Sequence, residues 1–264
     1  MSPPATALHK KSPAVRDLVS AEEWQVRVDL AAAYRLVAHY GWDDLIFTHL
    51  SARVPGPEHH FLINPYGMMF EEITASSLVK IDLEGNIQIP TSYPINLAGF
   101  VIHGAIHEAR EDARCVMHLH TRAGIAVSCQ KEGLLPLNQT ALAISSQVAY
   151  HDYEGIALDF DERPRLVAHL GDKSALILRN HGTLTVGPTV ADAFVRMYYL
   201  ERSCDIQVAA LSGGREINWP SEQSVETVRR QTANRPQGTS PTNGQMSWPA
   251  LLRKLDRMDP SFRD

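Results

Sequence analysis

The stretch CVMHLH, residues 115–120, places an apolar run of strand length directly before two histidines. Side chains two positions apart on a strand point to the same face. His118 and His120 can therefore direct two imidazoles toward one point, about 2.0–2.1 Å from each nitrogen, as a zinc-type site requires. Two hydrogen-bonded histidines at a strand end would produce the same short motif, so the motif alone leaves both interpretations open.

A second apolar run, residues 175–178, is followed by Arg-Asn-His-Gly at 179–182. A histidine at a strand end can supply a further metal ligand when the next residue is glycine, because glycine lets the backbone turn sharply. A simple turn histidine is the alternative. Two buried strands that end in histidine, far apart in the chain, are consistent with a site made by His118, His120 and His181.

Around these runs, helical and strand patterns are interleaved without strict β-α-β order. This predicts an α/β protein with a mixed sheet and helices around it. Ser20 and Glu23 form a capping-box signature at the start of the first helix. Helical patterns cover residues 21–40, 100–110, 121–128 and 190–211. Strand patterns cover residues 46–54, 60–63, 115–119 and 175–178, with a hairpin of 78–83 and 87–89.

The two ends of the chain differ in composition from its centre. Residues 1–20 are rich in Pro, Ala and Ser and are expected to be a flexible leader before a domain at 21–214. Residues 215–247 are expected to be a linker, because their second half is dense in Gln, Thr, Asn, Pro, Gly and Ser. Residues 248–264 predict a short amphipathic docking helix with Pro249 in its first turn.

Composition narrows the class of protein. Hydrophobic residues make up 44% of the 264 residues and charged residues 21%, a balance that allows a full globular core. The net charge of −5 argues against a nucleic-acid partner. No apolar run approaches the roughly 18–20 residues of a membrane span. Three widely spaced cysteines without a C-x-x-C pair favour free thiols, so we expect a cytoplasmic protein with neither a nucleic-acid nor a membrane partner.

Several longer motifs, in the same order along residues 22–212, resemble the class II aldolase/adducin family, closest to the adducin head domain and its bacterial relatives. They are THLSARV (48–54), FLINPYG (61–67), TASSLVKIDLEG (74–85), NLAGFVIHGAIHEAR (96–110), VAYHDYEGI (148–156) and LILRNHG (176–182). The resemblance implies a three-layer α/β/α fold with a central, largely antiparallel mixed sheet, and a homotetramer. It also implies one divalent metal per subunit on His118, His120 and His181, with Zn²⁺ preferred and Fe²⁺ or Mn²⁺ as alternatives.

Two departures separate this chain from the sugar-phosphate aldolases that the resemblance includes. Their glutamate, which serves as metal ligand or acid/base, is matched here by Gly99. The serine-containing pair that helps hold their substrate phosphate is matched by Leu97 and Ala98, and the asparagine of their phosphate loop by His49. Because glycine cannot bind metal or move a proton, and leucine and alanine offer no side-chain hydrogen bond, cleavage of phosphorylated sugars is not expected.

Candidate proton-transfer groups are His49, His151 and Tyr153. An imidazole with a pKa near its ordinary value of about 6.5 can act as acid or base at neutral pH. Each candidate has a structural alternative. His49 could be a strand-end hydrogen bonder, His151 a loop histidine paired with Asp152, and Tyr153 a packing residue.

The resemblance matches Asn64 and Gly67 to the substrate loop of the family, with Gly99 at the same site. Backbone amides of this loop and the Asn64 side chain could hold an anionic group such as a carboxylate, and a plain turn is the alternative. His103 and His107 share one helix face at i, i+4 spacing, a geometry that can bind metal. The resemblance places them on a packing helix, so no ligand role is expected for them.

Three functions are compatible with these residues. The first is a metal-dependent lyase that performs aldolase- or decarboxylase-type C–C cleavage on a small non-phosphorylated oxygenated or aromatic acid. The second is a non-haem Fe(II) oxygenase of aromatic hydroxy acids, because three histidines suit Fe²⁺ as well as Zn²⁺. The third is a non-catalytic, adducin-like binding or assembly protein. Three ligands with an open position are typical of a catalytic site, so an enzyme acting on a small molecule is the leading expectation.

Overall fold

A computed structural model describes residues 14–156, 159–233 and 243–264. Most of the leader expected at 1–20 lies outside the described residues. Its described end forms a short 3-10 turn, η1 (Val15–Leu18), directly before the first helix.

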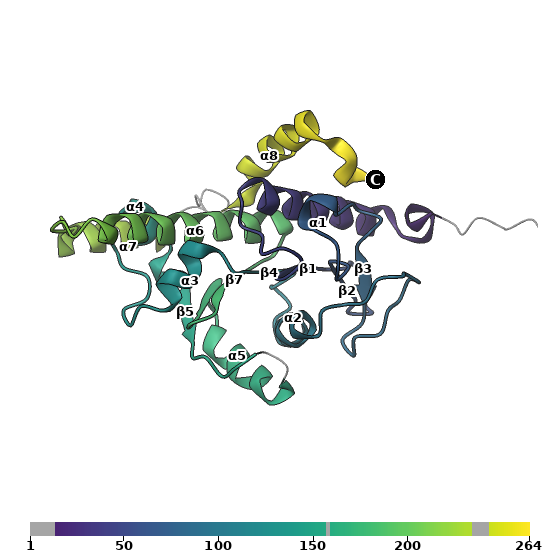
Figure 1. Cartoon of the computed structure of the whole chain (residues 1–264), viewed down its shortest axis with the longest axis horizontal. Helices are drawn as coiled ribbons and strands as arrows, with labels where there is room; N and C mark the ends of the chain where they lie inside the picture. Colours follow the sequence, from purple (N-terminus) through teal and green to yellow (C-terminus); the bar gives the residue numbers. More distant parts are fainter. Residues whose placement is uncertain (1–13, 157–158, 234–242) are drawn as a thin grey trace, which may run out of the picture.

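Within the described residues, seven strands form one mixed sheet in the order β3-β2-β1-β4-β7-β6-β5 (Figure 1). Neighbouring strands are antiparallel except β5 and β6, which are parallel. The strands are β1 (His49–Arg53), β2 (Phe61–Ile63), β3 (Val79–Ile81), β4 (Cys115–Leu119), β5 (Val148–His151), β6 (Ala175–Leu178) and β7 (Gly182–Gly187). The predicted α/β class with a largely antiparallel mixed sheet is confirmed.

Helices cover both faces of this sheet and complete the three layers (Figure 1). Side chains of β4 alternate between them: Met117 packs with α1 and α6, whereas Val116 packs with α2 and α5. This alternation follows from the two-residue period of a strand, and burial of each such side chain stabilises the fold by about 1.5–3 kcal/mol. The helices are α1 (Ala21–His39), α2 (Leu97–Ala109), α3 (Arg122–Ser128), α4 (Gln139–Ile144), α5 (Arg163–Leu170), α6 (Val190–Ser212), α7 (Glu222–Ala233) and α8 (Gly244–Met258).

Helix α1 is held on the sheet by polar contacts as well as by its apolar face. The Ser20 side chain accepts a hydrogen bond from the Glu23 N–H, as the capping signature predicts. The Glu23 carboxylate bonds the buried Arg27 at 2.9 Å instead of closing the capping box. Arg27 in turn donates to the carbonyls of Ala75 and Leu78, so the loop between β2 and β3 is tied to α1.

Two strand predictions were too long. The strand expected at 46–54 begins only at His49, because Leu45 and Thr48 adopt positive φ angles of 53° and 65° that interrupt an extended chain. The hairpin expected at 78–83 and 87–89 is reduced to β3 and one isolated bridge between Ile81 and Ile87.

The C-terminal region is more helical than its composition predicts. Helix α7 lies inside the stretch 215–247 that was expected to be a linker, and residues 234–242 lie outside the described residues. Helix α8 begins at Gly244 and not at Trp248, so Pro249 lies inside the helix and not in its first turn. The earlier start has a physical reason, because the Asn243 side chain caps the Gln245 N–H at 2.8 Å.

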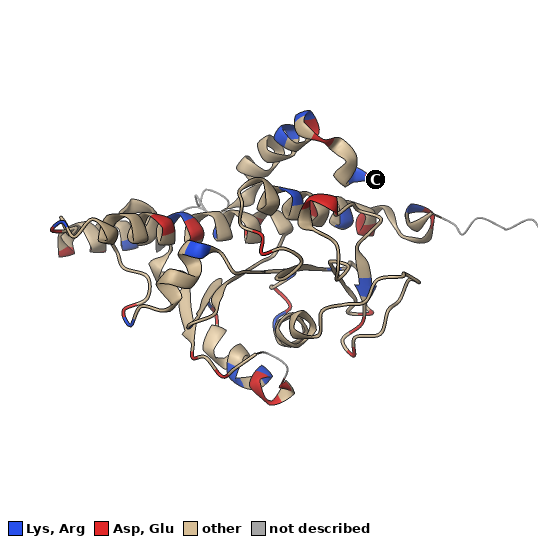
Figure 2. Ribbon diagram, viewed as in Figure 1, with Lys and Arg blue, Asp and Glu red and all other residues tan. Residues whose placement is uncertain are grey.

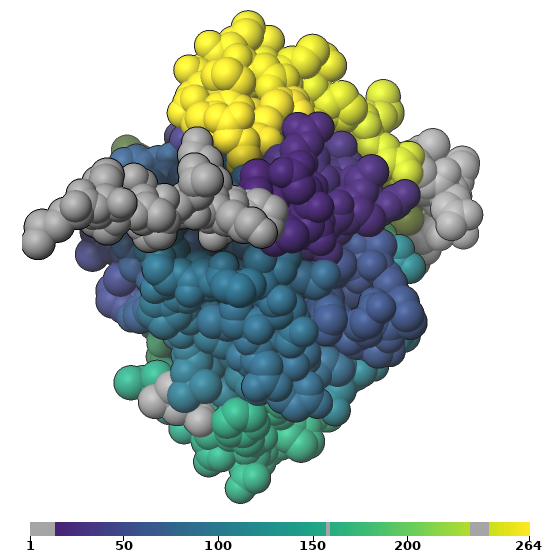
Figure 3. Space-filling model, turned by 90° about the vertical axis from the view of Figure 1, so that its right-hand side faces the viewer, coloured from purple at the N-terminus to yellow at the C-terminus, as the bar shows by residue number. Residues whose placement is uncertain are grey.

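The C-terminal segment lies against α1 of the same chain (Figures 1 and 3). The Trp248 indole donates to Asp29 at 2.8 Å, and Arg35 bonds Asp259 at 3.1 Å.

Acidic and basic residues are interspersed over the helices and loops in Figure 2, without a stretch of one sign on the sheet. In the described part of the chain, every helix is too short or too polar to cross a membrane.

Candidate metal centre

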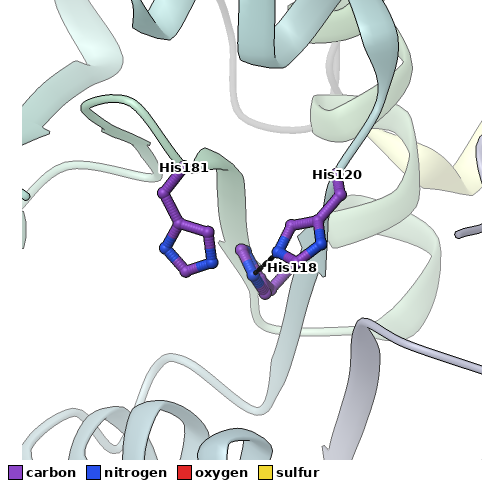
Figure 4. Close-up of side chains that lie close together, drawn as sticks. All are labelled: His118, His120 and His181. Carbon is purple, nitrogen blue, oxygen red and sulfur yellow. Dashed lines mark hydrogen bonds between the residues drawn. The ribbon is translucent and has the colours of Figure 1, made fainter. Parts of the chain in front are cut away.

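Three histidines gather at one end of the sheet (Figure 4). His118 lies on β4, His120 follows the end of β4, and His181 lies in the turn between β6 and β7. One ring nitrogen from each lies within 4.8 Å of the others, and the described residues contain no other such group of three or more His, Cys, Asp or Glu side chains. The fold therefore brings together the three ligands predicted from sequence, and metal binding itself stays a prediction.

The outer hydrogen bonds of two of these rings determine where their lone pairs point. Nδ1 of His118 lies 3.1 Å from the Thr183 carbonyl oxygen, and Nδ1 of His120 lies 3.1 Å from Oδ2 of Asp44. A carbonyl or a carboxylate can only accept, so both Nδ1 atoms carry a proton, and Nε2 is the atom of each ring that can offer a lone pair. Carboxylate and carbonyl partners of this kind orient metal-binding histidines in proteins.

The two Nε2 atoms face each other at 3.0 Å. Two lone pairs at this distance repel unless a cation or a proton lies between them. Burial lowers the pKa of His118 well below its ordinary value, and the His181 imidazole lowers it further. Three converging imidazole nitrogens fit one divalent cation such as Zn²⁺.

His181 is directed toward the other two rings by an unusual turn. Asn180 has a positive φ of 58°, and Gly182 follows. A Cβ at Gly182 would lie 2.5 Å from the Leu119 carbonyl oxygen and 3.2 Å from Cδ2 of His120, so only glycine allows β7 to start this close to the end of β4. Burial and the nearby imidazole of His120 lower the pKa of His181 to about 4, so this ring is neutral and can bind metal at pH 7.

His49 occupies the space into which a side chain at position 99 would project. It is the cross-strand partner of His118, and the two ring centroids lie 5.1 Å apart. A Cβ added at Gly99 would lie only 2.7 Å from Cδ2 of His49. The two departures found in the sequence are therefore linked: a residue larger than glycine at position 99 does not fit while His49 holds this position.

The position of His151 does not suit the proton-transfer role that was considered for it. His151 is buried at the end of β5, with Nδ1 2.7 Å from Nδ1 of His169 and Nε2 3.1 Å from Glu162. The predicted loop pair with Asp152 is not formed, because Asp152 lies 3.6 Å from Arg179 instead. Since both nitrogens of His151 are engaged, it is poorly placed to exchange protons with a substrate.

Tyr153 lies at the rim of the histidine cluster. Its side chain is 54% exposed, and its ring centroid is 6.4 Å from that of His181. It lines a small cavity together with His151 and His181. Its exposure argues against a purely packing role and leaves its hydroxyl free to meet a ligand.

The predicted substrate loop supplies an unpaired donor at the same end of the sheet. Asn64 is buried, and its Oδ1 accepts a hydrogen bond from the Tyr34 hydroxyl at 2.9 Å. Among the described residues, neither Nδ2 of Asn64 nor Oγ1 of Thr48 has a hydrogen-bond partner. Leaving such a group buried and unpaired costs about 1–3 kcal/mol, which a bound oxygen atom would offset. Gly67 has a φ of 112°, which only glycine adopts readily.

Sequence reasoning missed two acidic residues near the cluster. Asp44 orients His120 but lies in an irregular segment without a spacing pattern that would single it out. Glu201 accepts a hydrogen bond from Thr121, the residue after His120. Burial raises the pKa of Glu201 to about 7. The available signal for Glu201 was a carboxylate on the apolar face of the 190–211 helix.

Comparisons with known proteins identify the family of this chain. The sequence profile of the class II aldolase and adducin N-terminal domain matches residues 28–208. The chain belongs to this family. The predicted resemblance is thereby confirmed, and the three-histidine cluster falls within the matched residues.

Similar proteins in this family differ in what their names describe. An aldolase II superfamily protein from Pseudomonas syringae, solved by crystallography, is 54% identical with a TM-score of 0.89, covering 96% of this chain and 100% of that one. L-fuculose 1-phosphate aldolase from Glaciozyma antarctica PI12 is 27% identical with a TM-score of 0.79, covering 100% of this chain and 97% of that one. Alpha-adducin of Rattus norvegicus is 42% identical over 244 residues, which are 88% of this chain and 33% of adducin.

The contact between Asp44 and His120 leads to a testable prediction. Asp44→Ala should weaken divalent-metal binding by about tenfold, because outer partners of metal-binding histidines contribute roughly 10–100-fold and this carboxylate is half exposed. Competition with a chromophoric chelator measures the affinity. Asp43→Ala is the matched control, since no hydrogen bond or ion pair of Asp43 is found among the described residues. Equal affinities for the two variants would rule out an orienting role for Asp44.

Proposed function

We propose that this chain is a divalent-metal-dependent carbon–carbon lyase that acts on a small, non-phosphorylated oxygenated or aromatic acid. The observation that carries the proposal is the cluster of His118, His120 and His181 with a neutral His49 beside it. Three protein ligands leave a coordination position for a substrate, as in catalytic zinc sites. We propose Zn²⁺ as the ion, with Fe²⁺ or Mn²⁺ as alternatives. When bound, the ion would polarise a substrate carbonyl or carboxylate and stabilise an enolate-like oxygen.

The residues of the chain have separate tasks in this proposal. The Nδ2 amide of Asn64 donates to a substrate oxygen, since it is buried without another partner among the described residues. His49 takes up or returns the proton that accompanies cleavage, because its ring lies beside the cluster and its neutral form offers one lone pair. The Tyr153 hydroxyl at the rim can contact the far end of the substrate.

The residues at the start of α2 support a substrate without phosphate. Leu97 and Ala98 stand where a phosphate would be held, and neither side chain can donate a hydrogen bond. The Asn96 side chain caps α2, since its Oδ1 accepts from the Ala98 N–H at 3.1 Å. A carboxylate needs fewer donors than a phosphate, so an acid substrate fits this reduced set better.

We also propose that the active form is a homo-oligomer, a tetramer by analogy with the family. Leu45 and Phe47 are 62% and 43% exposed, and they lie one and three residues after Asp44, which contacts His120 of the histidine cluster. Apolar side chains exposed beside a site support coverage by another copy of the chain.

A non-catalytic role is the second candidate. The observation that favours it is the 42% identity to alpha-adducin, which extends over most of this chain. An assembly protein of this kind would neither need a loaded metal nor turn over a small acid.

The deciding experiment combines metal analysis with turnover. Protein purified without added metal should contain close to one Zn²⁺ or Mn²⁺ per chain and should release aldehyde or CO₂ from a panel of small hydroxy and keto acids. Iron in the site and oxygen uptake with aromatic hydroxy acids would instead identify an oxygenase. A site that resists loading, with no turnover, would favour the non-catalytic role, and faster cleavage of phosphorylated sugars would overturn the substrate class.

A further inference from the structure

A continuous chain of hydrogen bonds runs through the core from His49 to the end of α2. Its members are His49 and Ser51 on β1 and His103 and His107 on α2, and each is at most 3% exposed. Four contacts form the chain: His49 Nδ1 to His103 Nε2 at 2.8 Å, His103 Nδ1 to Ser51 Oγ at 2.5 Å, Ser51 Oγ to His107 Nε2 at 2.7 Å, and His107 Nδ1 to the Ala113 carbonyl at 3.1 Å.

Two periodicities bring these side chains together. His49 and Ser51 are two residues apart on a strand and therefore share its face, whereas Leu50 between them packs on the opposite side with α1. His103 and His107 are four residues apart on α2, which covers that same face of the sheet (Figure 1). The packing role expected for the two α2 histidines is correct but incomplete, because every ring nitrogen of both is also hydrogen-bonded.

The charge state of the three hydrogen-bonded histidines follows from their burial. Burial lowers the pKa of His107 to about 3, with Arg53 nearby adding to the effect. Burial also lowers the pKa of His49 and His103 well below the ordinary value. Among the described residues none of these three buried rings has a carboxylate partner that would stabilise a charge, so each is treated as neutral, with one N–H and one lone pair.

The donor and acceptor of each of these four hydrogen bonds then follow from the Ala113 carbonyl at one end of the series. The Ala113 carbonyl can only accept, so His107 donates from Nδ1 and accepts at Nε2. Ser51 gives its hydroxyl proton to His107 and accepts from His103 Nδ1. His103 accordingly has its lone pair on Nε2 and accepts from Nδ1 of His49. Any reversal would place two donors or two lone pairs face to face in a buried site, which is costly.

We propose that His107, Ser51 and His103 are positioning residues that hold His49 in its Nδ1–H tautomer. Nε2 of His49 is then left with a free lone pair, on the side of the ring that lies against Gly99. The His49 ring centroid lies 5.1 Å from that of His118, so this lone pair is beside the histidine cluster. Use of that lone pair as the proton acceptor of a lyase rests on the proposed function, whereas the tautomer itself does not.

We call the hydrogen-bonded series of His107, Ser51, His103 and His49 the relay. The relay also explains why an imidazole, rather than a carboxylate, can be the proton acceptor beside this cluster. A free histidine prefers the Nε2–H form, which would turn an N–H toward the site and leave no acceptor there. The relay inverts this preference and fixes the ring orientation as well. The histidine ligands His118 and His120 are ordered by the same principle, through Thr183 and Asp44.

The test is the tautomer of each histidine in the full-length protein labelled with ¹⁵N-histidine. Two-bond ¹H–¹⁵N correlation spectra distinguish a protonated from an unprotonated ring nitrogen. The expected result is the Nδ1–H form for His49, His103 and His107 together. An Nε2–H form of His49 in the wild-type protein overturns the proposal even if every variant fails to fold.

Ser51→Ala separates the relay from simple packing. It removes the hydroxyl at the centre of the chain, so at least half of the His49 and His103 populations should convert to the Nε2–H form. Ser51→Thr keeps the hydroxyl and should restore the wild-type spectrum. Ser203→Ala is the matched control, because Ser203 is equally buried but bonds only the Tyr199 carbonyl within α6. A folded Ser51→Ala protein with unchanged His49 tautomer would contradict the relay.

The tautomer experiment can fail or succeed independently of the test of the proposed lyase function. Correct tautomers without turnover or metal would leave the relay in place and remove the lyase. Turnover with His49 in the Nε2–H form would keep the lyase and remove the relay. In an active enzyme, Ser51→Ala should lower kcat by about tenfold with little change in KM, since general-base catalysis typically contributes 10²–10⁴-fold and the ring itself is retained.

Discussion

Replacing His118 and His120 together by alanine should reduce bound divalent metal from about one ion per chain to a trace. The reason is geometric. These two rings present facing Nε2 lone pairs 3.0 Å apart, and the remaining ligand, His181, cannot hold an ion alone. Elemental analysis of protein purified without added metal measures the loss. Stoichiometric metal in the double variant would place the ion elsewhere in the molecule.

The same variant has a second, independent readout in stability. A ligand that binds only the folded state stabilises it by about 2.7 kcal/mol at one hundred times its Kd. Zn²⁺ should therefore raise the Tm of the wild-type protein and leave that of the double variant unchanged. His59→Ala with His60→Ala is the matched control, because these two histidines lie in the loop between β1 and β2, away from the cluster. The control should keep both metal content and the Tm response.

Gly182→Ala is expected to affect both the fold and the site. Its Cβ would lie 2.5 Å from the Leu119 carbonyl oxygen, a backbone atom that cannot rotate away. The start of β7 must then move from the end of β4, which carries His118 and His120. Overpacking of this kind costs about 1–3 kcal/mol in the free energy of unfolding. We also expect metal affinity to fall by about tenfold or more, since small displacements around a metal site have effects of 10–100-fold.

Urea denaturation and metal titration measure the two effects of Gly182→Ala. Gly213→Ala is the control for the loss of glycine alone. Its Cβ would meet only Cγ of Arg215 at 3.9 Å, and its φ is negative. Because alanine restricts the unfolded chain, this change should be neutral or stabilising by up to about 1 kcal/mol. Wild-type stability and metal affinity in Gly182→Ala would show that β4 and β7 do not need this close approach.

Local patterns in the sequence were sufficient for the parts of the protein that depend on neighbouring residues. The apolar run 115–119, the cap at Ser20 and the long 190–211 helix follow from periodicity and capping, and the structure has them within one or two residues. The strands β5 and β7 were not predicted. Strand β5 has only four residues, and β7 begins and ends in glycine, so their pairing partners stabilise them more than their own side chains do.

In the candidate site, too, some features follow from local sequence patterns and others only from tertiary packing. His118 and His120 were indicated by spacing on one strand, because a two-residue period is a local property. The meeting with His181 depends on β7 pairing with β4, and the link between His49 and Gly99 depends on α2 crossing β1. The buried relay joins residues up to 56 positions apart in the chain. Sequence alone indicated that His118, His120 and His181 stand at strand ends, whereas only the tertiary packing decided which nitrogen of each ring carries its proton, because that depends on carbonyls and carboxylates contributed by distant elements.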